Sequence, residues 1–129
     1  MTEINILGLS VVLLFVQIFL QAGTALSELG NDYLTGPRDE TRVLKSAQAG
    51  RARRALDNLL ETYPAFIGLA LALAVTNKAG GIGAIGAVVW LVARVVYLGL
   101  YMTGVPMLRS LTWGVSLIGL VLMLVRLMF

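Results

Sequence analysis

The chain has 129 residues, of which 58% are hydrophobic and only 13% are charged, so it lacks the polar shell of a soluble domain and is typical of a membrane protein. Cysteine and histidine are both absent, which excludes disulfides and thiol catalysis and removes the usual metal ligands, so no metal site is expected. The net charge of +3 arises from basic residues clustered beside an apolar segment, a pattern that indicates membrane topology and anionic lipid rather than nucleic acid.

Four apolar segments follow one another along the chain, at about 4–26, 55–76, 82–102 and 108–129. Each is long enough to cross a hydrocarbon core of about 30 Å as a helix. Lipid cannot satisfy free backbone groups, so the spanning segments must be helical. The first is too long for a cleaved signal and lacks its basic start. We therefore predict an all-α membrane protein, a single domain over residues 1–129 built as an antiparallel four-helix bundle.

The connections between these segments differ in length. The first, about 27–53, is long, and we expect the second helix to begin within it near Glu40, before the bilayer. The connections 77–81 and 103–106 are short and contain Gly or Pro, so the helices that they join should be antiparallel neighbours. The glycine-rich run 80–86 is interpreted as a small-residue surface for close helix approach.

The basic residues predict the orientation of the chain in the membrane. Most of the ten Lys and Arg residues lie between Arg38 and Arg54, and Arg109 follows the third connection. Basic residues favour the cytoplasmic side. The first and third connections should therefore lie in the cytoplasm, with both termini outside.

Several polar residues interrupt the second segment. A charge within a membrane helix costs a few kcal/mol or more, which makes such residues functional candidates. Arg54, Asn58 and Glu61 stand at i, i+4 and i+7 and share one helix face. Two structural interpretations stay open, in which Arg54 merely flanks the helix or Glu61 pairs with Arg94. Asp57 is expected to pair with an arginine of the basic connection.

The third and fourth segments bring further polar residues to the same depth. Arg94, Tyr97 and Tyr101 share one face of the third, and Arg109 lies in the first turn of the fourth. Because the second helix runs outward and the third inward, all of these residues should meet near the cytoplasmic face. The tyrosines have an alternative role as interfacial residues. This convergence is the main indication of a site.

The chemistry of these side chains predicts the kind of ligand. Arginines bind carboxylates with bidentate geometry, Glu61 suits an amine and Asn58 suits an amide. The complementary ligand is a small zwitterion or polyanion near the interface, and an apolar co-substrate would enter from the lipid. Trp90 and Trp113 are expected to be packing or interfacial residues rather than ligand contacts.

The stretch 54–64, Arg-Ala-Leu-Asp-Asn-Leu-Leu-Glu-Thr-Tyr-Pro, resembles the second-helix signature of the MAPEG family, the membrane-associated proteins in eicosanoid and glutathione metabolism. The stretch 94–101, together with 106–110, is similar to the family's third helix and the start of its fourth. The long first connection and its Thr-Gly-Pro turn at 35–37 agree as well. The resemblance covers essentially the whole chain.

This resemblance implies a homotrimer of four-helix subunits, with glutathione bound between neighbouring subunits at one membrane face. It implies glutathione transferase or peroxidase chemistry on lipophilic small molecules, in a protein similar to the family's small bacterial branch and so placed in the inner membrane. Arg109 would stabilise the glutathione thiolate, because a nearby cation lowers a thiol pKa of about 8.5. The residues expected to bind glutathione are Arg54, Asn58, Glu61, Arg94, Tyr97 and Tyr101.

The sequence departs from the family pattern at a few positions. Leu56 stands where members often carry Gln or His, Thr62 where a Tyr occurs in leukotriene synthase, and 27–28 lacks a basic residue that eicosanoid members often have. These differences leave open a non-catalytic binding or scaffold protein of the same fold. A small multidrug transporter is another alternative. Such carriers need a carboxylate deep in a helix, whereas the first segment has Gln17 and Gln21.

Overall fold

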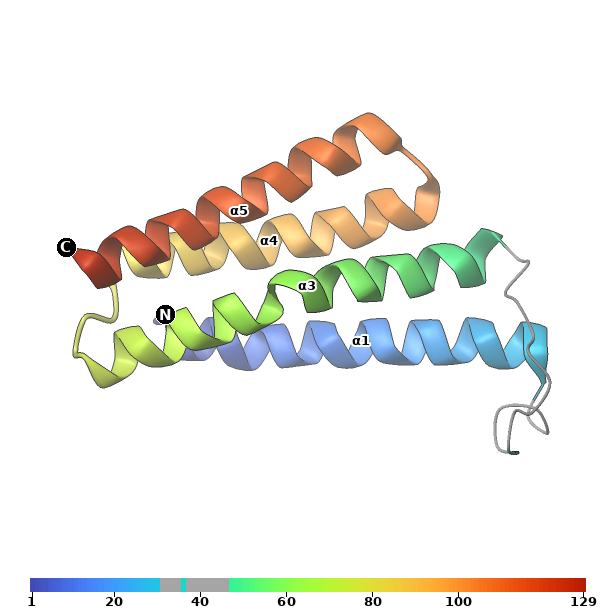
Figure 1. Ribbon diagram of the computed structural model, residues 1–129, viewed down its shortest axis with the longest axis horizontal. Coiled ribbons are helices and arrows are strands. Elements are labelled where there is room, and N and C mark those ends of the chain that lie inside the picture. Colours follow the sequence, from blue (N-terminus) through green and yellow to red (C-terminus); the bar gives the residue numbers. More distant parts are fainter. Residues whose placement is uncertain (31–35, 37–46) are drawn as a thin grey trace.

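The computed structural model describes residues 1–30, 36 and 47–129 of the chain. Within this part, the chain forms α1 (Glu3–Leu29), α3 (Ala47–Val75), α4 (Gly81–Thr103) and α5 (Pro106–Met128). The helices lie lengthwise beside one another, with both termini and the α3–α4 turn at one end of the bundle (Figure 1). The α4–α5 turn lies at the opposite end, and we call this end the Gly104 end.

All four helices are long and apolar enough to cross a membrane. Their positions agree with the apolar segments of the sequence, and the all-helical prediction is confirmed for the described residues. α3 begins at Ala47, well before the apolar segment at 55, as expected for a helix that projects from the bilayer. The expected start near Glu40 lies outside the described residues.

The two short turns rely on residues that tolerate a left-handed backbone. In the α3–α4 turn, Asn77 has a φ of 58° and Gly80 a φ of 96°. α4 ends at Gly104, whose φ of 79° closes the helix before Pro106 starts α5 at its first position. These residues explain why the neighbouring helices can reverse direction within so few residues.

The close pair of the bundle is α4 and α5. A Cβ atom built on Gly86 would lie 2.5 Å from the carbonyl oxygen of Gly119, and one built on Gly119 would lie 2.5 Å from the carbonyl oxygen of Gly86. The backbones therefore touch where neither residue has a side chain, which confirms the small-residue interpretation of 80–86. From this crossing the two helices diverge toward the Gly104 end (Figure 1).

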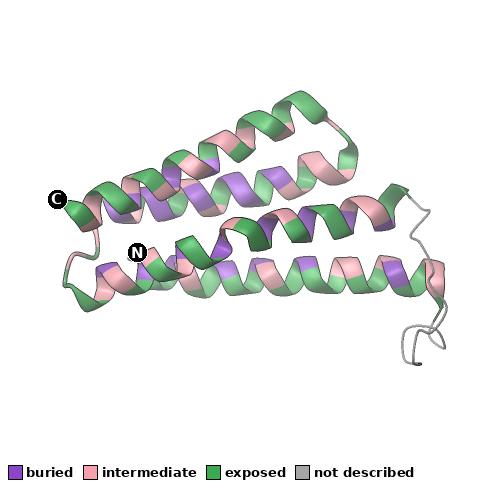
Figure 2. Cartoon of the chain, in the orientation of Figure 1, coloured by how far each residue is buried: buried purple, intermediate pink, exposed green. Residues whose placement is uncertain are grey.

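Aromatic residues fill the centre of the bundle. The rings of Phe66 and Trp90 stack with centroids 4.0 Å apart, and Tyr63 lies 5.7 Å from Trp90. The Tyr63 hydroxyl lies 2.8 Å from Ser10 Oγ, which joins α3 to α1. The buried residues follow the inner faces, whereas the outer faces are largely exposed (Figure 2). This pattern suits a bundle whose outer apolar surface meets lipid or further protein.

Polar contacts close the end that carries the termini. The fully buried Glu3 accepts hydrogen bonds from the backbone N–H of Gly80 at 2.9 and 3.1 Å. Arg126 Nε donates to the carbonyl oxygen of Lys78 at 2.9 Å, and Lys78 Nζ donates to that of Leu127 at 2.8 Å. The start of α1 and the end of α5 are thus fixed to the α3–α4 turn. The cavity described below lies toward the opposite, Gly104 end.

Candidate functional site

Arginines of α3 attach this helix to the end of α4. Arg51 Nη1 donates to the carbonyl oxygen of Met102 at 3.2 Å, in the last turn of α4, where unpaired carbonyls favour a cation. Arg54 Nε donates to the hydroxyl of Tyr101 at 3.0 Å. These bonds hold the polar start of α3 against the part of α4 that carries the predicted tyrosines.

Tyr101 contacts two guanidinium groups. The guanidinium carbon of Arg109 lies 4.7 Å from the centre of its ring, and that of Arg54 lies 5.9 Å from it. Both distances fall within the range in which the negative face of an aromatic ring attracts a cation. The ring therefore keeps two like charges close together at the Gly104 end, which creates a local positive potential that attracts anions.

Arg94 forms the buried part of the site. Its side chain is 1% exposed, Nη1 donates to Asn58 Oδ1 at 2.9 Å, and its guanidinium carbon lies 4.5 Å from the centre of the Tyr97 ring. Nε and Nη2 of Arg94 have no hydrogen-bond partner among the described residues. A buried cation with unpaired donors is costly. The arrangement is therefore one that an anionic partner nearby would stabilise.

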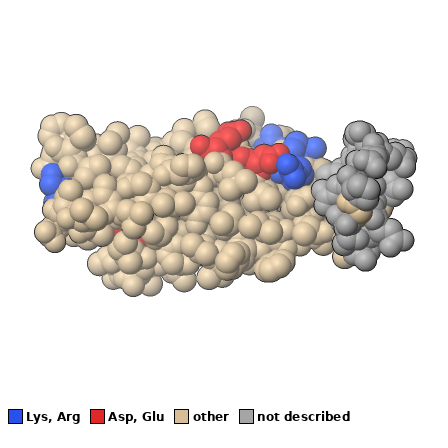
Figure 3. Space-filling model, turned by 60° about the horizontal axis from the view of Figure 1, so that its bottom comes forward, with Lys and Arg blue, Asp and Glu red and all other residues tan. Residues whose placement is uncertain are grey.

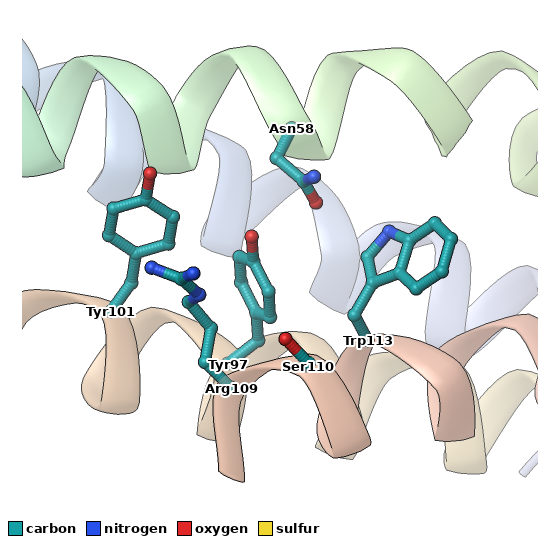
Figure 4. Close-up of a pocket in the computed structure, with 6 residues that line it drawn as sticks. All are labelled: Asn58, Tyr97, Tyr101, Arg109, Ser110 and Trp113. Carbon is teal, nitrogen blue, oxygen red and sulfur yellow. The ribbon is translucent and has the colours of Figure 1, made fainter. Parts of the chain in front are cut away.

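A cavity of about 450 Å³ opens beside these groups. Side chains from three helices line it, and they point toward a common space in Figure 4. The lining residues are Asn58 of α3, Tyr97 and Tyr101 of α4, and Arg109, Ser110 and Trp113 of α5. The predicted convergence of polar residues from three helices at one depth is thus present in the structure.

The predicted site residues occupy three kinds of position. Asn58, Tyr97, Tyr101 and Arg109 line the cavity, while Arg54 and Arg94 contact residues of its wall. Glu61 is exposed on α3 and does not line the cavity. No ion pair joins Glu61 to Arg94 among the described residues, but the two charges lie close enough to interact electrostatically, so the structural pairing considered for them stays a prediction. Arg94 instead reaches Asn58, the residue that faces α4.

Asp57 pairs with the basic connection, as expected. Arg53 Nε lies 3.4 Å from Asp57 Oδ1, and the two side chains are 57% and 54% exposed. Such an exposed pair contributes little to stability. In Figure 3 most charged atoms gather toward the end that carries the residues drawn in grey, and the rest of that face is nearly uncharged. The polar end and the apolar body of the molecule are therefore clearly separated.

Two cavity residues were missed by the sequence reasoning. Ser110 and Trp113 follow Arg109 by one and four residues, and the i, i+4 spacing places Trp113 on the face of Arg109. That spacing is the sequence feature that could have placed Trp113 beside Arg109 in the site. Trp90 is fully buried in the core, as expected of a packing residue, whereas Trp113 is 37% exposed and lines the cavity, so it is not a core residue and its interfacial role stays a prediction.

The departures from the family pattern have a structural setting. Leu56 is 8% exposed and belongs to the core, so its apolar side chain suits its position. The hydroxyl of Thr62 is buried and has no hydrogen-bond partner among the described residues. Neither residue lines the cavity.

The functional groups of the cavity favour an organic anion over a metal ion. Arginine, tyrosine and asparagine supply hydrogen-bond donors, which bind oxyanions. In the described part of the chain, no cluster of acidic residues is placed to hold a metal. Gln17 is buried in α1 and neutral, and the described acidic residues of that helix lie near its ends, which does not favour a proton-coupled carrier.

Four membrane-length helices, with a polar cavity at one end that Arg109 lines and two further arginines adjoin, define a multi-pass integral membrane protein. The family model that matches the sequence is that of the MAPEG family, over residues 6–129. The chain therefore belongs to the MAPEG family, which confirms the resemblance seen in its second and third helices. No curated protein and no solved structure matches it.

Proposed function

We propose that the protein is a glutathione-dependent membrane transferase or peroxidase that acts on lipophilic electrophiles, with Arg109 stabilising the glutathione thiolate. The observation that supports this most directly is the guanidinium of Arg109, which lines the cavity and lies 4.7 Å from the ring centre of Tyr101. Membership of the MAPEG family supplies the class of chemistry.

The cavity has groups that complement glutathione. The tripeptide carries two carboxylates, an amine, two amides and a thiol. Arg54 and Arg109 favour carboxylate or thiolate, and Asn58 can bind an amide, since only its Oδ1 is occupied by Arg94. The volume of about 450 Å³ lies within the usual range of small-molecule sites.

The reaction requires only a thiolate and an electrophile. Arg109 favours loss of the thiol proton to solvent, because its positive charge stabilises the resulting anion. In transfer, the sulfur attacks an electrophilic carbon, a C–S bond forms and the leaving group departs with its electron pair. In peroxide reduction, the sulfur attacks a peroxide oxygen, the O–O bond breaks to give an alcohol, and a second glutathione reduces the sulfenic acid to yield disulfide and water.

The proposal includes a homotrimer with glutathione between neighbouring copies. Glu61 is exposed on a helix that crosses the membrane, and a charge that faces lipid costs a few kcal/mol. A second copy packed on this face of α3 would cover Glu61 and bring its carboxylate to the amine of a glutathione held between the two copies. Exposed Asp57, one turn before it, would lie beside the same interface.

We further propose that the chain lies in a bacterial inner membrane, with its cavity at the cytoplasmic face and both termini outside. The support is the distribution of charge. Arg51, Arg53, Arg54 and Arg109 all lie at the end of the bundle that holds the cavity, and basic residues favour the cytoplasmic side.

The decisive variant is Arg109→Gln, assayed as the purified protein with glutathione and chlorodinitrobenzene. Loss of the cation should lower kcat by about 10²- to 10³-fold, the usual cost of removing one group that stabilises an anion in a reaction. Arg126→Gln is the matched control, because it removes the same side chain from the other end of α5. It should leave kcat unchanged, and both variants should keep the subunit number of the wild type.

Binding is measured separately, through thermal protection of the wild-type protein by glutathione. Protection without turnover of electrophiles or hydroperoxides would identify the non-catalytic member of the family and refute the enzyme assignment. If wild-type protein shows neither protection nor turnover, the proposal fails entirely.

A further inference from the structure

The residues that line the cavity form two chemically different parts. Arg109 and Tyr101 form one part, with two guanidiniums in reach, and Trp113 forms the other. Trp113 stands four residues after Arg109 in α5, so it lies about 6 Å further along the helix, away from the Gly104 end. The charged part is therefore near the membrane interface, and the indole part lies deeper in the apolar span.

The space in front of the indole is open and contains polar groups. Figure 4 shows Tyr97 and Trp113 on either side of Ser110, with the Asn58 amide across from them. Tyr97 and Trp113 make no ring contact with each other, although both line the cavity. Trp113 keeps 37% of its surface exposed, which leaves its ring accessible to a ligand.

The hydrogen bonds that these polar groups already make show which donors and acceptors remain for a ligand. Asn58 Oδ1 already accepts from Arg94, which leaves the amide N–H groups of Asn58 as donors. Ser110 Oγ donates to the carbonyl oxygen of Pro106 at 3.2 Å, which leaves its lone pairs as acceptors. The Asn58 N–H groups and the Tyr97 hydroxyl thus place donors suited to a nitro or carbonyl oxygen in the same cavity as the electron-rich indole of Trp113.

We propose that Trp113 forms the binding wall for the electrophilic co-substrate and selects flat conjugated electrophiles carrying a nitro or carbonyl group over saturated alkyl hydroperoxides. The inference rests on the proposed function. A flat electron-poor ring gains offset stacking on the indole beyond the area that it buries, whereas an alkyl chain gains area alone. Because Trp113 lies further along α5 than Arg109, in the apolar span, this wall suits a co-substrate that arrives from lipid.

With chlorodinitrobenzene, the reaction is an addition of the thiolate to the ring followed by loss of chloride. The thiolate sulfur bonds to the ring carbon that carries chlorine, and negative charge develops on the nitro oxygens. The N–H groups of Asn58 can donate hydrogen bonds to these oxygens and so stabilise that charge. The C–Cl bond then breaks and chloride leaves with its electron pair, while the thiol proton has already passed to solvent.

The kinetic test compares Trp113→Leu with Trp113→Phe. In the leucine variant, KM for chlorodinitrobenzene should rise by about 3- to 10-fold, and the phenylalanine variant should recover most of the loss. KM for glutathione, and kcat/KM for tert-butyl hydroperoxide, should stay within about 2-fold of wild type, because neither depends on stacking. Equal losses for both co-substrates, or no loss with leucine, would overturn the inference.

A fluorescence measurement tests the same contact without glutathione. The chain has two tryptophans, and Trp90 is fully buried against Phe66. Unreactive dinitrobenzene should therefore quench the emission of Trp113 in a saturable way, and Trp113→Phe should abolish the saturable part. As a matched control, Leu111→Trp in the Trp113→Phe background places an exposed indole on α5 outside the cavity and should give only linear quenching.

The two proposals fail in different ways. Saturable quenching of Trp113 without any thermal protection by glutathione would support the wall and refute the enzyme assignment. Protection by glutathione combined with linear quenching of Trp113 would leave the enzyme assignment standing and refute the wall.

Discussion

Tyr101 illustrates how one side chain organises the charged part of the cavity. Its hydroxyl accepts from Arg54 Nε, and its ring lies under the guanidinium of Arg109. The ring and its hydroxyl thus give each of these two like charges a favourable partner. Tyr101 therefore acts as a positioning residue, because it fixes the cations that the proposed ligand would meet.

Separate substitutions can remove the two functions of Tyr101. Tyr101→Phe keeps the ring under Arg109 but loses the hydrogen bond to Arg54, so glutathione should bind about 3- to 10-fold more weakly. Tyr101→Leu also loses the attraction between ring and cation and should weaken binding further. Isothermal titration of the purified variants checks both. Equal affinity of the leucine variant and the wild type would show that Tyr101 has no positioning role.

Gln17 is a polar residue without a visible benefit to the fold. It is 2% exposed, and both amide atoms lack a hydrogen-bond partner among the described residues. Its burial leaves no surface through which a second copy could supply one. Because an unsatisfied buried amide costs about 1–3 kcal/mol, Gln17→Leu should stabilise the protein.

Thermal unfolding in detergent measures the effect of Gln17→Leu, and Tm should rise. Gln21→Leu is the comparison, since Gln21 lies one turn further along α1 and is only partly buried. An equal rise in both variants would indicate a general gain in hydrophobicity instead. A fall in Tm for Gln17→Leu would contradict the prediction and show that the buried amide stabilises the fold.

At the scale of elements, the crossing of α4 and α5 sets the shape of the cavity. Gly86 and Gly119 let the two backbones touch, and the helices diverge from that point toward Arg109. A methyl group on Gly119 would lie 2.7 Å from the backbone nitrogen of Trp90 and 2.5 Å from the carbonyl oxygen of Gly86. Backbone atoms cannot move aside as a flexible side chain can.

Gly119→Ala should therefore destabilise the protein by about 1–3 kcal/mol, although alanine is the better helix former. Gly114→Ala is a matched control on the same helix, because a Cβ there would meet nothing within 4 Å. It should be neutral or stabilising by up to about 1 kcal/mol. Chemical unfolding of the two variants provides the comparison, and equal effects would contradict the backbone contact.

The elements were largely predictable from the sequence because hydrophobic length determines a membrane helix. Gly104 and Pro106 also indicated where α4 would end and α5 begin. The depth of the site followed from helix direction alone, since Arg54 and Tyr101 had to meet if neighbouring helices were antiparallel. These inferences need only the rise per residue and the order of the segments.

The rotation of each helix about its axis was not predictable in the same way. Glu61 was assigned to the site because it shares a face with Arg54 and Asn58, but that face is broad, and only Asn58 lines the cavity. Trp113 is expected from the sequence to be a packing or interfacial residue, and in the structure it lines the cavity. The contact at Gly119 fixes that rotation, and its partner across the helices is not visible in the sequence.

For the whole molecule, the separation of charge predicts a single orientation in the membrane. The turn after α3 carries Lys78, whereas the end with the α4–α5 turn gathers Arg51, Arg54 and Arg109. If the basic end faces the cytoplasm, Thr76 lies outside and Thr103 inside. Both residues are exposed at helix ends, so a side chain placed there is accessible from its own side.

The absence of native cysteine makes this orientation measurable. In intact bacterial cells, a membrane-impermeant maleimide should label Thr76→Cys and spare Thr103→Cys. Inside-out vesicles should reverse the result, which also shows that the unlabelled thiol is reactive. Labelling of Thr103→Cys alone in intact cells would invert the topology and place the cavity outside, away from the cytoplasmic glutathione pool on which the proposed chemistry depends.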